Sequence, residues 1–540
     1  MASKWTVPTT TASVIDAATP EAGEVIYVSD KKEFRYGDGT TQGGVKLYPN
    51  SLGEAFVYGV NRDHSYSSPT AGMQKVVLNV DAGSYTNVSG SFSQMPVHNL
   101  KRCVMDDLAN RHVNYYLNAS NSALKAAGGN ADLTGVDGDV MVEFPVGHYR
   151  IDKYTDDSSH EHTVKLISDK PFPGSAPFPA FYVSNGGSTL QAQYMGAFKA
   201  SIDANSKCRS IIGVKPTVSK TRAQFRTAAV ANGGTLANML LKVWLGWLAE
   251  IEFASTDVQT SISKGFSEMS AYDAAYLRQC GRTVSLGNGT GEIIADSTAP
   301  TITVNSVVYT RYLAGDSGSA KAWKNESDAV IYTNTDSPVQ GTATYSDTAM
   351  QTSTGYTVAS VTAAGIDFDL EGHWNNGASK VVSCAYRGVE DPWGACWEFD
   401  DGIQKYQDAV SGDYTKSGYW FTTDTSKYTL LDSDKGYGPA NTPFPAAGNT
   451  GANTAWVSHA WPKTAGYIKA YDPLTYFPTD VTGSSTTYLC DYLYNDANAG
   501  ARVVFRGGYL CNGAFVGAFC VLVIYELSHA GAGPGGRLAA

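Results

Sequence analysis

The sequence lacks the features that mark several large classes of protein. It has no stretch of about 18 apolar residues, so no segment is long enough to span a membrane as a helix. The N-terminus lacks the apolar core of a secretory signal. The eight cysteines include no C-x-x-C pair, which leaves no zinc or redox signature and favours free thiols. The net charge of −11 argues against a nucleic-acid partner, because such a partner favours a basic surface.

The composition is typical of a β-rich protein with many loops. Glycine accounts for 55 of the 540 residues and tyrosine for 33, and serine and threonine are abundant. A single hydrophobic core stops growing near ~250–300 residues, so the chain is long enough for more than one domain. We therefore expect an α+β protein in which strands and loops outweigh helices.

Residues 1–50 contain the pattern of a short β-hairpin. Strands are predicted at 25–28 and 33–36, with a turn at Asp30-Lys31 and a stop at Gly37-Asp38-Gly39. A hairpin of this size is too small to fold alone. The Gly-Asp-Gly-Thr spacing resembles the N-terminal module of phage tail fibres and tropism proteins, in which three chains interlock into a prism. This resemblance implies a homotrimer.

The middle of the chain has a less regular pattern. We expect residues 51–135 to form a spacer or linking region, with a helix at about 100–117. Residues 136–540 are predicted to form one large domain. It is interrupted at about 296–370 by a Thr/Ser/Val-rich stretch of short alternations, which favours a small β-rich insert.

Four elements are predicted near the start of this large domain. Strands are expected at 139–150 and 194–200, and a helix is expected from about Thr221 to Ala229. A second helix is predicted from apolar residues that recur at three- and four-residue steps. These residues are Leu236, Leu240, Trp244, Trp247, Leu248 and Ile251.

The last 35 residues have an unusual pattern, since their bulky side chains follow neither a strand alternation nor a helical period. They begin with Arg506-Gly507-Gly508, continue through Asn512-Gly513-Ala514 and close with Gly536-Arg537-Leu538. This frame resembles the C-terminal variable region of proteins diversified by retroelements of phages and bacteria. With the Trp-Gly-x-x-Trp-Glu-Phe-x-Asp-Gly segment at 393–402, the resemblance implies a C-type-lectin-like fold, as in formylglycine-generating-type proteins.

The same resemblance separates variable, ligand-binding positions from constant ones. The positions implied to vary are Tyr509, Leu510, Cys511, Asn512, Phe515, Cys520, Leu522, Ile524, Tyr525, Leu527, His529, Gly531 and Gly533. The scaffold positions are Arg506, Gly507, Gly508, Gly513, Gly517, Gly536, Arg537, Trp393 and Trp397. Rigid apolar side chains at variable positions would supply contact area at a low cost in entropy. Arg537 is expected to be a buried anchor whose guanidinium binds loop carbonyls.

Other interpretations of these residues stay open. Residues 506–540 are also compatible with the core of a buried β-hairpin. Cys511 and Cys520 would be the cysteine pair of a formylglycine-generating-type enzyme, but they stand nine apart where that family's pair stands five apart. Asp400 and Asp401 are candidate carboxylates of a glycosidase, although adjacent acids are more typical of a solvated turn.

Two further groups of residues are candidate binding sites, one for a sugar and one for a metal ion. Trp393 and Trp397 would suit a sugar-stacking platform, but this spacing is more typical of a buried core. His160-Glu161-His162 offers two metal ligands in a Ser/Asp-rich loop that provides no third. The Glu-Pro-Asn, Gln-Pro-Asp and Trp-Asn-Asp strings of calcium-dependent lectins are absent. We therefore expect no metal and no cofactor.

These resemblances predict a receptor-binding, tropism-determining protein rather than an enzyme, with a non-diversified structural tail protein as the alternative. The expected partners are a host cell-surface protein or glycan and other virion tail proteins, without membrane insertion or nucleic acid. A protein that acts outside the cell without a secretory signal fits a phage tail-fibre tip that is made in the bacterial cytoplasm and released by lysis. Several trimeric fibres per virion would add avidity.

Overall fold

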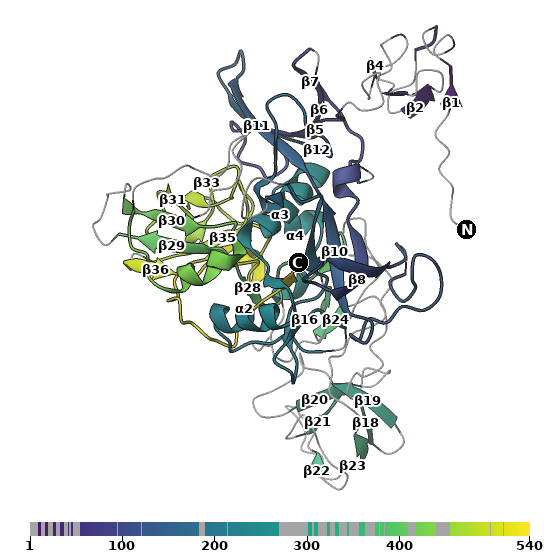
Figure 1. The fold of residues 1–540 in the computed structure, drawn as a ribbon, viewed down its shortest axis with the longest axis vertical. Coiled ribbons are helices and arrows are strands. Elements are labelled where there is room, and N and C mark those ends of the chain that lie inside the picture. Colours follow the sequence, from purple (N-terminus) through teal and green to yellow (C-terminus); the bar gives the residue numbers. More distant parts are fainter. Residues whose placement is uncertain are drawn as a thin grey trace.

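The computed structural model describes residues 55–268 and 384–540, with gaps at 81, 94, 120, 183–188, 213, 409–415, 439–453, 497 and 511. Outside these ranges it describes strands and a few single residues. The described chain is a mixed α+β structure in which many short strands surround few helices, in agreement with the predicted class. Figure 1 shows the long helix α3 (Met239–Phe253) among sheets that come from both halves of the chain.

Two six-stranded sheets carry most of the N-terminal half. The first has the order β13-β11-β12-β5-β6-β7 and the second the order β17-β40-β14-β10-β8-β9. The strands of the first sheet are β5 (Tyr58–Asp63), β6 (Met73–Asn79), β7 (Ser84–Asn87), β11 (His148–Thr155), β12 (Glu161–Ser168) and β13 (Ala176–Pro177). Those of the second are β8 (Lys101–Asp107), β9 (His112–Tyr116), β10 (Asp139–Pro145), β14 (Ala192–Gly196), β17 (Thr235–Leu236) and β40 (Leu538–Ala539).

Within residues 51–135 the structure contains strands of the two large sheets in place of the expected spacer. Strand β5 pairs antiparallel with β12, and β8 pairs antiparallel with β10, so this region supplies strands to both large sheets. The helix expected at about 100–117 is also wrong, because β8 and β9 occupy that range. The strand expected at 139–150 is two strands, β10 and β11, and the one expected at 194–200 is β14, which ends at Gly196.

The two predicted helices are present. Helix α2 (Arg222–Ala231) begins after Thr221, whose side chain accepts a hydrogen bond from the Gln224 amide in a full capping box. Helix α3 begins after Asn238, whose side chain accepts from the Leu241 amide. Almost every residue of α3 is buried, so it is a central helix rather than one with a single apolar stripe. The short helix α4 (Val258–Ser261) follows it.

Helix α3 joins the two halves of the chain through its packing. On one side the Trp244 ring lies 4.5 Å from that of Phe178. On the other side Gly246 is so close to the C-terminal segment that a Cβ there would lie 3.1 Å from the Phe519 ring. The hydrophobic core therefore runs without interruption from the N-terminal sheets to residues 506–540.

Two sheets belong mainly to residues 384–540. One has the order β32-β35-β38-β37-β28-β39 and the other the order β31-β30-β29-β36. The first contains β28 (Trp397–Phe399), β32 (Gly466–Tyr467), β35 (Tyr492–Tyr494), β37 (Phe505–Arg506), β38 (Val521–Leu522) and β39 (Pro534–Gly535). The second contains β29 (Ile403–Gln407), β30 (Gly418–Phe421), β31 (Ala455–Ser458) and β36 (Gly500–Arg502).

Two further sheets lie at opposite ends of the view in Figure 1. The N-terminal sheet contains the predicted hairpin, β2 (Val25–Val28) and β3 (Glu33–Tyr36), flanked by β1 (Thr9–Thr10) and β4 (Val45–Lys46). Within the stretch expected to be a β-rich insert, six strands form a sheet of their own with the order β21-β20-β19-β18-β23-β22. They are β18 (Thr301–Val304), β19 (Val307–Arg311), β20 (Lys321–Lys324), β21 (Val330–Thr333), β22 (Ala343–Thr344) and β23 (Tyr356–Val361).

Four two-stranded pairs complete the described strands. They are β15 (Ser201–Ile202) with β16 (Cys208–Arg209), β24 (His373–Asn376) with β25 (Ser379–Val382), β26 (Ala385–Tyr386) with β27 (Val389–Glu390), and β33 (Ala470–Tyr471) with β34 (Pro478–Asp480).

Candidate functional site

Residues 506–540 enter and leave the fold through two buried arginines. Arg506 ends β37 and is 3% exposed, and Arg537 directly precedes β40 and is 1% exposed. Arg537 donates from Nε to Glu398 Oε1 at 2.9 Å and from its two terminal nitrogens to four backbone carbonyls. These carbonyls belong to Gly196, Ala197, Glu390 and Asp391. Arg537 thus makes the carbonyl contacts that the sequence predicted for it.

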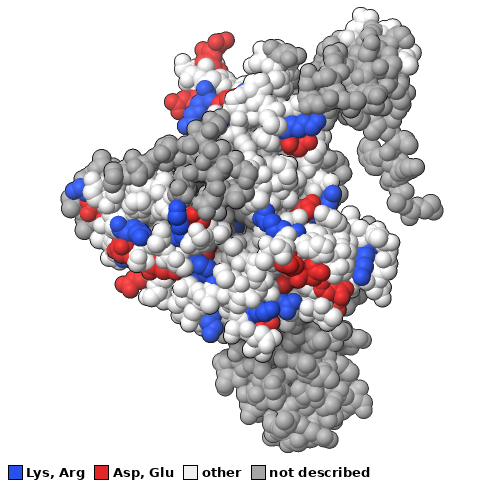
Figure 2. Space-filling view, in the orientation of Figure 1, with Lys and Arg blue, Asp and Glu red and all other residues white. Residues whose placement is uncertain are grey.

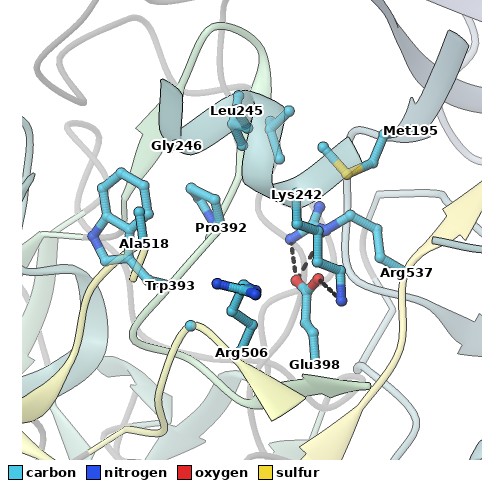
Figure 3. A pocket seen from close by; sticks show the side chains of 12 residues that line it. Met195, Lys242, Leu245, Gly246, Pro392, Trp393, Glu398, Arg506, Ala518 and Arg537 are labelled. Carbon is cyan, nitrogen blue, oxygen red and sulfur yellow. Dashed lines mark hydrogen bonds and ion pairs between the residues drawn. The ribbon is translucent and has the colours of Figure 1, made fainter. Parts of the chain in front are cut away.

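Two carboxylates beside β37 hold both arginines. Glu398 lies in β28 and Asp400 directly follows that strand. Arg506 Nε donates to Asp400 Oδ2 at 2.9 Å, while Lys242 Nζ lies 3.2 Å from Asp400 Oδ1 and 3.3 Å from Glu398 Oε2. Lys199 Nζ donates to Glu398 Oε1 at 2.6 Å. Burial alone would raise the pKa of Glu398, but the surrounding arginine and lysines hold that pKa well below its usual value (Figure 3).

The acidic pair is buried rather than part of a solvated turn. Asp400 is 0% and Asp401 1% exposed. Arg226 donates to both oxygens of Asp401, at 2.6 and 2.8 Å. Each carboxylate is therefore bound by an arginine, and neither faces open space as a glycosidase carboxylate must.

Trp393 and Trp397 also lie in the core. Trp393 is 1% exposed and donates from Nε1 to the Ser263 carbonyl at 2.8 Å. Trp397 is 7% exposed, and its ring meets the Tyr494 ring edge to face at 5.6 Å. The buried-core interpretation of these tryptophans therefore fits the structure better than a sugar-stacking platform.

The sheet that contains β37 has two chemically different faces. Successive side chains of a strand point to opposite faces, and residues directly opposite on neighbouring strands share a face. Glu398, Arg506 and Val521 are opposite one another and define the inner face, toward α3. Phe399, Phe505, Leu522 and Tyr494 are opposite one another and define the outer face.

The thirteen positions predicted to bind ligand differ in their exposure to solvent. Four of them have buried side chains, namely Tyr509, Leu510, Cys520 and Leu522. The candidate site therefore contains fewer residues than the sequence indicated. Cys511 lies outside the described residues. The other eight are partly or fully exposed: Asn512, Phe515, Ile524, Tyr525, Leu527, His529, Gly531 and Gly533.

A group of half-buried aromatic rings surrounds Phe515. It closes the short 3-10 helix Gly513–Phe515, and its ring centroid lies 4.5 Å from Tyr492, 5.5 Å from Tyr467 and 6.0 Å from Tyr494. Tyr467 and Tyr492 are opposite each other on β32 and β35, and Tyr494 follows Tyr492 on the same face. These three tyrosines lie outside the predicted segment, and the alternation Tyr492-Leu493-Tyr494 is the local signal that marks two of them as a pair.

A second group of rings forms around Tyr525. The Tyr525 and His529 rings stack at 3.8 Å with 12° between their planes, and each meets the Phe505 ring edge to face at 6.1 Å. Tyr525 is 39% exposed. Burial lowers the pKa of His529 below its usual value, which favours the neutral form of the ring.

The two groups lie over the same sheet. Tyr494 is opposite Leu522, and Leu522 is opposite Phe505, so one row of outer-face residues leads from the Phe515 group to the Tyr525 group. We call the six accessible rings the aromatic face: Tyr467, Tyr492, Tyr494, Phe515, Tyr525 and His529. Half-exposed aromatic side chains of this kind combine apolar contact area with polar edges.

The described residues offer little to support catalysis by cysteine or metal. Cys520 is fully buried, and burial raises the pKa of its thiol well above the usual value, which opposes the reactive thiolate. His160 Nδ1 lies 3.4 Å from Asp63 Oδ2, and His162 Nε2 lies 3.4 Å from Asp156 Oδ2. Across the described part of the chain, no group of three or more His, Cys, Asp or Glu side chains is arranged to hold a metal ion.

Comparison with known proteins gives matches among solved structures alone. No protein-family model matches the sequence, and no curated protein matches it either. The structure is similar to those of major tropism determinant variants. The M1 variant is 10% identical, with a TM-score of 0.23 over 99% of this chain and 98% of its own. The U1 and P3c variants are 9% and 11% identical, with TM-scores of 0.23 and 0.22 over 99% of both chains.

Two surface properties bear on possible partners. None of the helices in the described ranges combines the length and the apolar character needed to cross a bilayer. Figure 2 shows one side of the molecule, where lysines and arginines are interspersed with aspartates and glutamates between broad uncharged areas. The described part of this side therefore carries no extended basic surface of the kind that nucleic acids bind.

Proposed function

We propose that this protein is a receptor-binding, tropism-determining protein of a phage or prophage, which displays a ligand-binding face diversified by a retroelement. The ligand is a host cell-surface protein or glycan. The constant residues of the segment 506–540 fix its backbone, and side chains that reach the surface vary.

One observation carries this proposal: the two arginines that frame the segment are buried, whereas most of the described positions implied to vary reach the surface. Arg506 and Arg537 are buried and bound to Asp400 and Glu398 on the inner face. Eight of the twelve described variable positions reach the surface instead. A site built this way can change its contact residues without losing the interactions that hold the segment in place.

The chemistry of the aromatic face fits recognition of a macromolecular surface. Tyrosine and phenylalanine supply large, rigid contact areas that lose little entropy on binding, and tyrosine adds a hydroxyl that bonds to polar groups. Tyr467, Tyr492 and Tyr494 would form a fixed part of this face, to which the variable Phe515 adds a ring. Binding through these side chains requires no metal ion or cofactor.

The remaining parts of the proposal rest on resemblance in sequence. Residues 136–540, together with the strands β5 to β9 that pair into the same sheets, would form a C-type-lectin-like domain with a β-rich insert at about 296–370. The hairpin β2–β3 would interlock with two copies of itself and make the protein a homotrimer at the tip of a virion tail fibre. Multiple sites on one trimer would raise the avidity for a repetitive cell surface.

The test is to sequence the gene and its flanking DNA in many isolates. We expect a second copy of the segment that encodes residues 506–540, and substitutions concentrated at Phe515, Ile524, Tyr525, Leu527 and His529. The four buried positions should change only to residues of similar volume.

The constant frame provides the internal control of this test, because Arg506 and Arg537 should stay unchanged in every isolate. An invariant segment without a second copy would contradict the proposal and favour a structural tail protein that is not diversified. Substitutions spread evenly over frame and surface would contradict it as well.

A further inference from the structure

The inner face of the sheet carries more positive than negative charge. The charged side chains that meet there are Lys199, Lys242, Arg506, Arg537, Glu398 and Asp400, and none of them is more than 8% exposed. Among the residues that the structure describes, these four cations face two carboxylates. Glu390 nearby is bound by Arg102 at 2.7 Å, so it does not offset the excess. Asp391 is also buried, and counting its carboxylate still leaves one positive charge in excess.

Arg506 has a donor that no atom of the described residues accepts. Its Nε donates to Asp400 Oδ2 at 2.9 Å and one terminal nitrogen donates to the Thr475 carbonyl at 3.5 Å. The other terminal nitrogen, Nη1, is buried and has no hydrogen-bond partner within the described part of the chain. A buried guanidinium N–H that has lost water and gained no acceptor is strongly unfavourable.

A small cavity lies beside the Arg506 side chain. Its volume is about 20 Å³, and its lining includes Lys242, Trp393, Glu398, Arg506, Gly507 and Arg537. Figure 3 shows the Arg506 guanidinium in the open space between Trp393 and Glu398, with Lys242 and Arg537 on the other side of Glu398. A space of this size accepts one water molecule or one monatomic ion and excludes sulfate and phosphate.

We propose that this cavity is a binding site for a single chloride ion. A chloride ion accepts hydrogen bonds from Arg506 Nη1 and also offsets the excess positive charge. A water molecule accepts the hydrogen bonds but does not offset the charge. The ion adds a link between Arg506, which opens the segment 506–540, and the charges that bind Arg537, which closes it. This inference concerns the scaffold and does not depend on the receptor-binding proposal.

Crystals grown from protein dialysed into sodium bromide test the site directly. We expect an anomalous bromine peak in the cavity within about 3.5 Å of Arg506 Nη1, because bromide replaces chloride at such sites. Density for water alone, or an empty cavity, would overturn the proposal.

Thermal unfolding provides an independent measurement. The full chain should have a higher Tm in sodium chloride or bromide than in sodium gluconate of equal ionic strength, with an effect that saturates with halide concentration. An equal Tm in the three salts would contradict a specific halide site.

A matched pair of variants tests the charge argument. Lys242→Met removes one cation from the cavity lining, and we expect at least a tenfold weaker apparent affinity for halide. Lys405→Met also removes a fully buried lysine, but one that donates to Asn495 and does not line the cavity, so its halide dependence should equal that of the wild type. Unchanged halide affinity in Lys242→Met would refute the site. If that variant does not fold, the bromide crystals of the wild type decide.

Discussion

Phe505 and Arg506 are neighbours in β37 whose side chains lie on opposite faces of one sheet. Arg506 binds Asp400 on the inner face, while the Phe505 ring on the outer face supports Tyr525 and His529. The strand alternation therefore separates the interactions that hold the segment 506–540 from the rings available to a ligand. Substitution of the buried charges on the inner face should lower stability, whereas substitution of the accessible rings of the aromatic face should weaken binding.

Arg537→Ala tests the inner face. The change removes one of the three cations that bind the buried Glu398, together with the guanidinium donors to four carbonyls, so we expect the free energy of unfolding to fall by about 3–5 kcal/mol. Urea titration followed by tryptophan fluorescence measures it. The control is Arg502→Ala on β36, whose side chain donates to the adjacent Ala501 carbonyl and to no other described residue, and a loss below about 1 kcal/mol is expected there. Equal losses in the two variants would contradict the anchoring role of Arg537.

A pair of glycines separates backbone strain from lack of space. Gly508 and Gly513 have φ of +77° and +58°, so alanine is strained at both, by about 1–2 kcal/mol. At Gly508 a Cβ would also lie 2.6 Å from Val516 Cγ2, whereas nothing lies within 4 Å of a Cβ at Gly513. We expect Gly508→Ala to lose about 1–3 kcal/mol more than Gly513→Ala in the same titration. Similar losses would mean that Val516 moves aside freely.

Features of the fold that depend on a few consecutive residues were predictable from the sequence. The hairpin of β2 and β3 has the predicted bounds, and α2 begins after Thr221 because the cap signal lies within three residues. The helix expected at about 100–117 was wrong for a physical reason. Cys103, Val104 and Met105 in β8 are all buried, on both faces of the sheet, so they lack the alternation that marks a half-exposed strand.

The arrangement of the candidate site depends even more on contacts between residues that lie far apart in the sequence. The tyrosines of β35 alternate, which is a local signal, but their position beside Phe515 depends on the parallel pairing of β35 with β38. Nothing in the nearby sequence specifies that pairing. The burial of Tyr509, Leu510 and Cys520 depends equally on distant packing, since Leu510 donates its amide to the Ala395 carbonyl in another part of the chain. Which side chains of the predicted segment are exposed could therefore not be predicted from its sequence.

The stability of the protein should depend on pH through His459. Burial lowers the pKa of this ring to about 4, although the Pro478 carbonyl, which accepts from Nε2 at 2.8 Å, and Asp472 favour the charged form. From pH 6.5 down to about 4 the unfolded chain therefore binds a proton that the folded chain does not. The free energy of unfolding should then fall by about 1.4 kcal/mol per pH unit from this group.

His459→Gln isolates that contribution, because the other titrating groups are common to both proteins. Urea titrations at pH 7, 6 and 5 should show the stability difference between wild type and variant shrinking as the pH falls. A difference that stays constant with pH would mean that His459 titrates normally in the folded protein.

The N-terminal hairpin should control the oligomeric state. If three copies of β2–β3 interlock, the full chain should sediment with three times the mass of one chain, and a variant that lacks residues 1–50 should sediment as a single chain. A monomeric full-length protein, or a trimer that survives the deletion, would place the association elsewhere or exclude it.

Tyr525→Ala and Tyr154→Ala provide the sharpest test of the aromatic face. The two tyrosines are 39% and 38% exposed, and each stacks on a histidine, Tyr525 on His529 at 3.8 Å and Tyr154 on His162 at 4.6 Å. Both changes remove an exposed ring at a similar small cost in stability, within about 1 kcal/mol. Only Tyr525 lies over the outer face of the sheet, so only its loss should weaken adsorption.

The measurement is adsorption of the purified, labelled protein to intact cells from a panel of bacterial strains. On strains that the wild type binds, we expect Tyr525→Ala to bind at least tenfold more weakly, which corresponds to about 1.4 kcal/mol per site and is typical of an aromatic contact residue. Tyr154→Ala should bind like the wild type. Phe515→Ala should weaken binding as Tyr525→Ala does, because the two rings lie at opposite ends of the same row of outer-face residues. Equal binding by all three variants would locate the receptor site away from the aromatic face.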